Sequence, residues 1–167
     1  MGLFPETNQW ELLTAAGLRG DFQAAWIEGD DVDAIAAEAG CDPRDTLDCG
    51  LTTALRWHGL GSRATLAWMG PHAPGWTFAL VFGDADPRLG LTERRVFDLW
   101  YAREIDEFSG PGALYEEEGL DDLDLNDDVG DEDDLEPHLV AVGRLTGRFV
   151  DAAWLAERRT LRRVTAS

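Results

Sequence analysis

Apolar side chains recur at two spacings along this chain, and the shorter spacing predicts β-strands. In residues 22–28 large apolar positions alternate with smaller or polar ones, as in a half-buried strand. Residues 63–69 and 76–82 are apolar, β-prone runs on either side of the breaker-rich sequence GPHAPG, which predicts an antiparallel hairpin at the centre of a sheet. The aromatic and branched run at residues 94–102 predicts a further strand.

The longer spacing, of three and four residues, predicts helices. Asn8 and Glu11 have the form of a capping box, from which we expect a short helix over residues 8–16. Acidic capping residues at 30–31 precede apolar positions at helical spacing, which stop at Gly40. The strand at 22–28 and this second helix form the clearest supersecondary unit of the N-terminal half.

The C-terminal part also has a helical pattern. Pro137 suits the first turn of a helix whose apolar stripe continues to Phe149. Asp151 is placed to cap a short helix that follows, and residues 160–164 are typical of an edge strand or a tail.

The stretch 42–57 is less regular. Pro43 suits a helix start, whereas Gly50 interrupts the middle of the segment, and we expect the stretch to be helical.

These elements predict one α+β domain over residues 1–167, a mainly antiparallel sheet with helices at the N- and C-terminal ends. A chain of 167 residues with seven Trp and seven Phe is long and apolar enough to bury a core. Residues 116–136 interrupt the pattern, and we expect an acidic, partly irregular insertion there.

This acidic tract, residues 116–136, holds thirteen acidic residues and no basic one, in a chain whose net charge is −19. A sequence pI near 4.2 argues against direct binding to nucleic acid or anionic lipid, whose phosphates such a field repels. No run approaches the roughly 20 apolar residues that a membrane helix needs. The first residues lack a secretory signal, and Cys41 and Cys49 are too few for a disulfide scaffold, so we expect a cytoplasmic protein.

Three segments of the sequence resemble an actinobacterial family of small cytosolic proteins known only as a domain of unknown function. They are DFQAAWIEGDDVDAIAAEAG (21–40), GWTFALVFG (75–83) and LVAVGRLTGRFVDAAWL (139–155). The resemblance implies the same order of strands and helices. It implies no activity, because the family has none assigned, and the acidic tract departs from the family pattern.

The leading functional prediction is a non-enzymatic protein-interaction domain of the inhibitor, immunity or adaptor type. Clustered carboxylates speed association with basic partners, and Leu120, Leu123, Leu125 and Leu135 are candidate apolar anchors. A solubilising loop and a mimic of a nucleic-acid backbone are the alternatives for the same tract. The candidate partner-binding residues are Glu116, Glu117, Glu118, Asp121, Asp122, Asp124, Asp127, Asp128, Asp131, Glu132, Asp133 and Asp134.

A small-ligand or cation-binding protein is the alternative from another class. Acidic residues from Asp122 to Asp133 follow the spacing of a calcium-binding loop, although Asp127 stands where that loop requires Gly. Trp68, His72 and Trp76 could instead rim a cleft for a small molecule.

No catalytic residue, metal site or cofactor is predicted. Cys41, Cys49 and His58 lack the spacing of structural zinc ligands, and a Cys49 nucleophile with a His58 base has only weak support. The C-terminal arginines, Arg158, Arg159, Arg162 and Arg163, could dock against the acidic tract or leave a bipolar molecule that self-associates.

Overall fold

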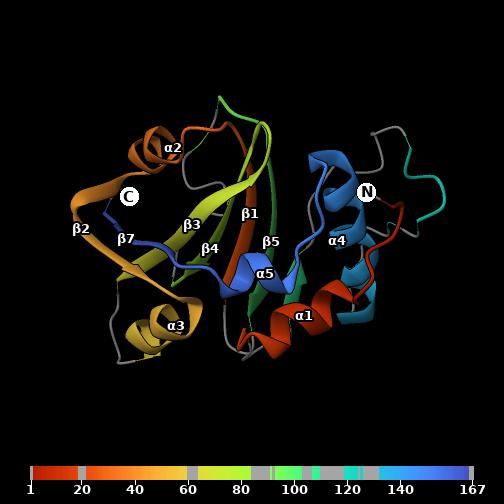
Figure 1. Cartoon of the computed structure of the whole chain (residues 1–167), viewed down its shortest axis with the longest axis horizontal. Helices are drawn as coiled ribbons and strands as arrows, with labels where there is room; N and C mark the ends of the chain where they lie inside the picture. The colour runs from red at the N-terminus through yellow and green to blue at the C-terminus, as the bar shows by residue number, and fades with distance from the viewer. Residues whose placement is uncertain are drawn as a thin grey trace.

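A computed structural model describes most of the chain. It covers residues 2–18, 22–59, 64–83, 91, 93–102, 107–109, 119–123, 125 and 132–165. Within these ranges the protein has an antiparallel sheet with helices on both faces, which confirms the predicted α+β class (Figure 1).

In the described part of the chain the sheet has seven strands, in the order β2-β7-β3-β4-β1-β5-β6. Every pairing between these described strands is antiparallel, unlike the parallel pairing of an α/β fold. The strands are β1 (Phe22–Glu28), β2 (Cys41–Cys49), β3 (Thr65–Ala73), β4 (Trp76–Phe82), β5 (Val96–Ala102), β6 (Glu107–Ser109) and β7 (Arg159–Val164).

Five helices accompany the sheet in the described ranges. Figure 1 shows two of them, α2 and α3, towards the β2 edge, and α1 and α4 beside β5. Their bounds are α1 (Gln9–Ala15), α2 (Val32–Glu38), α3 (Leu51–Gly59), α4 (Glu132–Thr146) and α5 (Ala152–Ala156).

The alternation of side chains along the central strands divides the core into two layers. Trp26 of β1 and Phe78 of β4 lie in the larger layer, where residues of α1, α3, α4 and α5 pack. Ile27 of β1 and Val81 of β4 lie in the smaller layer, which α2 covers with Ile35. Because both faces are covered, β1 is buried at six of its seven positions and is not the half-buried strand that the sequence predicts.

Most predicted elements are confirmed. Asn8 accepts a hydrogen bond from the backbone N–H of Glu11 at 2.9 Å and caps α1, and Asp31 caps α2 in the same way. Strands β3 and β4 form the expected antiparallel hairpin, although β3 runs on to Ala73 through residues predicted to be a loop. Asp151 caps α5.

The predicted helix over 42–57 is wrong in its first half. Residues 41–49 form the edge strand β2, and the helix begins only after Gly50. Strand β2 is mostly polar and exposed, with a register shift between Cys41 and Thr46, so it shows no apolar alternation. Proline, charges and such irregularities are ordinary features of an edge strand, because they discourage pairing with another chain.

Two C-terminal boundaries also differ from the prediction. Helix α4 begins at Glu132, so Pro137 lies inside the helix rather than in its first turn. Residues 160–164 belong to β7, which is an interior strand between β2 and β3 rather than an edge strand or tail. The sheet is therefore completed by the C-terminal segment of the chain.

Gly143 in α4 gives a test of this packing. A Cβ atom at residue 143 would collide with the ring of Phe149. Alanine normally stabilises a helix interior by about 1 kcal/mol relative to glycine, so a Gly143→Ala variant that instead loses about 1–3 kcal/mol would report the steric contact. Urea unfolding measures the change. Gly2→Ala is the control, because Gly2 is exposed and a Cβ there would be in ordinary contact with the Phe4 carbonyl oxygen at 3.7 Å, and it should stay within about 0.5 kcal/mol of the parent.

Candidate functional site

The acidic tract is attached to the folded core at both of its ends. Leu120 and Leu135 are buried in the larger core layer, and Leu123 and Leu125 pack against that layer. The prediction that these leucines anchor a partner is therefore wrong for Leu120 and Leu135, whose side chains are buried in this chain's own core, whereas Leu123 and Leu125 are only partly buried. The hydrophobic effect holds both ends of the tract in place.

Arg144, in the last turn of α4, joins the beginning of the tract to the N-terminal segment. Its guanidinium donates to both carboxylate oxygens of Asp122, at 2.7 and 2.9 Å. The same group donates to the carbonyl oxygens of Leu3 at 2.7 Å and Gly119 at 3.3 Å. The hydrogen bond from Arg144 lowers the pKa of the Asp122 carboxyl below its ordinary value. The Arg144 side chain is only 9% exposed, so its charge is used inside the molecule.

Two exposed apolar side chains lie next to this arginine. Leu3 is 70% exposed and Phe4 is 58% exposed, which is unusual for residues of their size. The Arg144 guanidinium lies over the Phe4 ring, 4.8 Å from its centroid. Arg144 therefore brings Leu3 and Phe4 to the same place as Asp122, and Figure 1 shows the N-terminal segment and the 119–123 segment at one end of the molecule.

Glu136, the last acidic residue of the tract, has a structural role. Its carboxylate accepts hydrogen bonds from the backbone N–H groups of Gln9, at 2.7 and 2.8 Å, and of Trp10, at 3.1 Å. These N–H groups lie in the first turn of α1, where helix donors lack intrahelical acceptors. Burial raises the pKa of Glu136, and the two N–H groups act in the opposite direction. Glu136 thus connects the start of α4 to the start of α1.

The other predicted partner-binding residues divide into three groups. Asp121 is exposed and Asp122 is paired with Arg144. Glu132, Asp133 and Asp134 form the first turn of α4, where negative charge favours the helix. Glu116, Glu117, Glu118, Asp124, Asp127, Asp128 and Asp131 lie outside the described residues.

The C-terminal arginines pair with acids elsewhere than the tract. Their described partners are Asp48 for Arg158 at 3.9 Å, Glu157 for Arg159 at 3.0 Å, Asp33 for Arg162 at 2.7 Å and Asp45 for Arg163 at 3.6 Å. All four partners lie outside residues 116–136, so the observed ion pairs do not support docking of these arginines onto the tract.

One carboxylate of the predicted calcium-binding loop is already engaged in another contact. Asp122, the first ligand of the proposed loop, holds a guanidinium with both oxygens, and a cation would have to displace that group. Within the described ranges, no group of three or more His, Cys, Asp or Glu side chains is arranged to hold a metal ion.

The proposed small-molecule cleft at Trp68, His72 and Trp76 is also wrong, because all three side chains are buried. The Trp68 indole donates to the carbonyl of Cys49 at 3.0 Å, deep in the larger core layer. His72 contacts the hydroxyl of Thr146 at 3.0 Å. These residues stabilise the core and do not rim a cleft.

The two cysteines are likewise core residues. Cys41 and Cys49 are the first and last residues of β2, and both thiols are buried. Burial raises the pKa of each thiol. A thiol with a raised pKa is a poorer nucleophile at neutral pH, so the structure gives no support to a catalytic Cys49.

No family model, curated protein or solved structure matches this chain. The resemblance to the actinobacterial family therefore stays a prediction. In the described part of the chain, no helix has the length and apolar character that crossing a bilayer requires.

The sequence did not predict that Leu3, Phe4 and Arg144 lie together with Asp122 of the acidic tract. A weak signal was present, because Leu3 and Phe4 are large apolar residues that precede the first predicted helix. Their position beside the acidic tract depends on Arg144, which reaches both segments from α4, and such a three-way contact has no periodic signature.

Replacing Glu136 tests the link between α1 and α4. Glu136→Ala should destabilise the protein by about 2 kcal/mol, because it leaves buried N–H donors of Gln9 and Trp10 without their charged acceptor. Asp121→Ala is the matched control, an exposed acidic residue at the other end of the tract, and should change stability by less than about 0.5 kcal/mol. Equal effects in urea unfolding would contradict the structural role of Glu136.

His72 should make stability depend on pH. Burial lowers its pKa to about 4 from an ordinary 6.5, so between these values the unfolded chain binds a proton that the folded protein does not. This contribution is complete above pH 6.5 and is lost as the pH falls towards 4, with about 2 kcal/mol lost between pH 7.5 and pH 5. Urea unfolding at both pH values measures it. His72→Gln should lack this component, and an unchanged pH dependence would count against the buried neutral imidazole.

Proposed function

We propose that this protein is a non-enzymatic interaction domain that binds a basic protein partner, as an inhibitor, immunity or adaptor protein does. The binding surface combines acidic side chains of the tract with the exposed side chains of Leu3 and Phe4. We call it the acidic surface. The observation that carries the proposal is the set of contacts of Arg144, which hold Leu3 and Phe4 beside Asp122 at the described beginning of the tract.

Charge supports this proposal in two ways. The acidic tract contains thirteen acidic residues. Asp122 and Glu136 use their carboxylates for contacts within the chain, whereas Asp121 is exposed. The described ion pairs of the C-terminal arginines are with acids outside the tract. Such an uncompensated field accelerates association with a positively charged partner and disfavours anionic ones.

Apolar side chains supply the binding affinity that charged contacts alone do not. Charged contacts at a rim set the rate and the salt dependence of binding, whereas buried apolar anchors contribute most of the affinity. Leu3 and Phe4 can fill this role, because they are exposed and held in position by Arg144. Leu120 and Leu135 of the tract cannot, because they are already in the core.

A labelled arginine-rich peptide with two leucines is a suitable probe, with fluorescence anisotropy as the readout. Changing Asp121, Asp127 and Asp128 together to Asn should weaken binding about tenfold at low salt, since each exposed pair contributes up to about 1 kcal/mol. The difference from the parent protein should shrink at 0.5 M salt, where screening is strong. Leu3→Ser should weaken binding several-fold at both salt concentrations, because the apolar contact is not screened.

Matched controls separate a surface from net charge alone. Changing Glu28 and Glu93 to Gln together with Asp42 to Asn removes the same number of charges away from the tract. Trp57→Ala removes an exposed apolar side chain at the other end of the molecule. If these controls weaken binding as much as the tract and Leu3 variants do, the acidic surface is not the binding site.

A further inference from the structure

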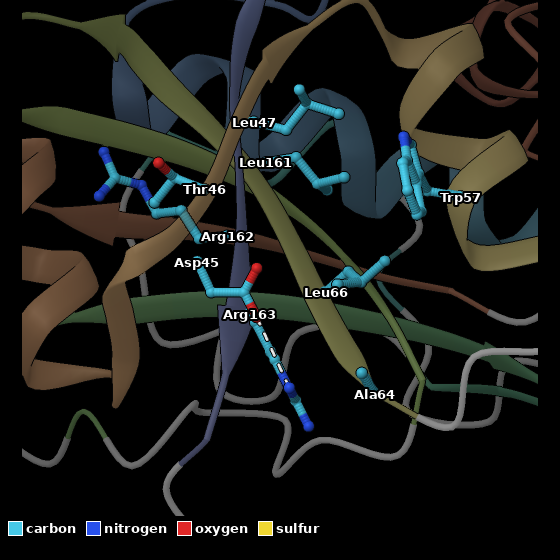
Figure 2. A pocket seen from close by; sticks show the side chains of 9 residues that line it. All are labelled: Asp45, Thr46, Leu47, Trp57, Ala64, Leu66, Leu161, Arg162 and Arg163. Atoms are coloured by element: carbon cyan, nitrogen blue, oxygen red, sulfur yellow. Dashed lines mark ion pairs between the residues drawn. The ribbon is translucent and has the colours of Figure 1, made fainter.

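A groove lies at the opposite end of the molecule from the acidic surface. It has a volume of about 650 Å³ and is bounded by β2, β7, β3 and α3 (Figure 2). This volume is within the range of about 300–1,000 Å³ that is typical of sites for small molecules. Residues of α3 and of the edge strand β2 both line the groove.

The wall of the groove is apolar because of the strand register. Leu47 of β2 pairs with Leu161 of β7, so both side chains lie on the same face of the sheet. Leu161 also pairs with Trp68 of β3, and Leu66, two residues before Trp68 in β3, lies on that same face. Trp57 of α3 stands opposite these leucines in Figure 2. Leu47 is 40% exposed and Trp57 is 51% exposed, so a ligand could cover surface that water now contacts.

One guanidinium faces the rim of this groove. Arg163 lies 3.6 Å from the carboxylate of Asp45, and both side chains are more than half exposed. An ion pair this long and this exposed contributes little, so Arg163 can accept a second anion at small cost. The guanidinium of Arg162 points away from the apolar wall in Figure 2 and pairs with Asp33. The site therefore offers one positive group for one negative group.

The neighbourhood favours an anion although the whole chain is acidic. Arg44 and Arg56 are exposed and adjoin the lining residues Asp45 and Trp57 in the sequence. Arg158, also exposed, pairs with Asp48 beside Leu47. Charge at this end is close to balanced, in contrast to the acidic tract.

The edge of β2 argues against a protein strand as the occupant. Pro43 cannot donate a backbone hydrogen bond, and the register of β2 shifts between Cys41 and Thr46. These features blunt a sheet edge against strand addition. A small molecule needs only the side chains of the groove and not the edge itself.

We propose that this groove binds a free small molecule that joins an apolar chain or ring to a single carboxylate. The apolar part lies against Leu47, Leu66, Leu161 and Trp57, and the carboxylate lies on Arg163, where it competes with Asp45. A monocarboxylate matches the single available guanidinium better than a doubly charged phosphate does. The site shares no residue with the acidic surface, so each proposal can fail alone.

Decanoate is the probe, measured below its micelle concentration by titration calorimetry and by shifts of the Leu47, Leu66 and Leu161 methyl resonances. Arg163→Gln and Trp57→Ala should each weaken binding about tenfold, through loss of the charged and the apolar contact respectively. Asp45→Asn should strengthen binding several-fold, because it removes the competing carboxylate. This gain cannot arise from damage to the fold.

The controls use the same protein and ligands of matched length. Leu3→Ser removes an exposed apolar residue elsewhere and should leave decanoate binding unchanged. Decylamine should bind at least tenfold more weakly than decanoate if Arg163 recognises charge. Equal binding of the amine, no gain in Asp45→Asn, or absence of decanoate binding would each overturn the proposal. Tighter binding of a leucine-rich tetrapeptide with a free C-terminal carboxylate would assign the groove to a peptide instead.

Discussion

Strand β4 is buried along its whole length, and this burial requires cover on both faces of the sheet. Each face must exclude water from large apolar side chains, which is the main free-energy gain of folding. Helix α2 covers the smaller layer, and α1, α3, α4 and α5 cover the larger one. Towards the β2 edge the apolar side chains of Leu47 and Trp57 remain exposed, and both of them line the groove.

The same requirement explains why the acidic tract is tied to the fold. The chain must pass from the β6 edge of the sheet to α4, whose Leu135, Leu139 and Val142 complete the larger core layer. Leu120 packs into that layer on the way. Both described ends of the tract are therefore packed into the fold, through Leu120 at one end and Leu135 at the other. Glu136 and Asp122 then use their charges for contacts with α1 and Arg144.

The sequence predicted the elements whose local signals agree with their tertiary setting. Capping residues Asn8, Asp31 and Asp151 do in the structure what their positions predict, since capping needs only neighbours along the chain. Strand β2 was missed because an edge strand carries no apolar alternation, and the place of β7 inside the sheet depends on pairing with distant segments. The groove combines β2, β3, β7 and α3, so it could not be read from any one of them.

The acidic surface and the groove can coexist because the sheet separates them. Seven strands spaced about 4.8 Å apart place the two edges of the sheet roughly 29 Å from each other. The Debye length at physiological ionic strength is about 8 Å, so the field of the acidic tract is largely screened at the β2 edge. Local pairing then decides which ion binds there. Six of the described arginines belong to β2, α3 and β7 or adjoin them, which makes an anion acceptable in a chain with a net charge of −19; they are Arg44, Arg56, Arg158, Arg159, Arg162 and Arg163.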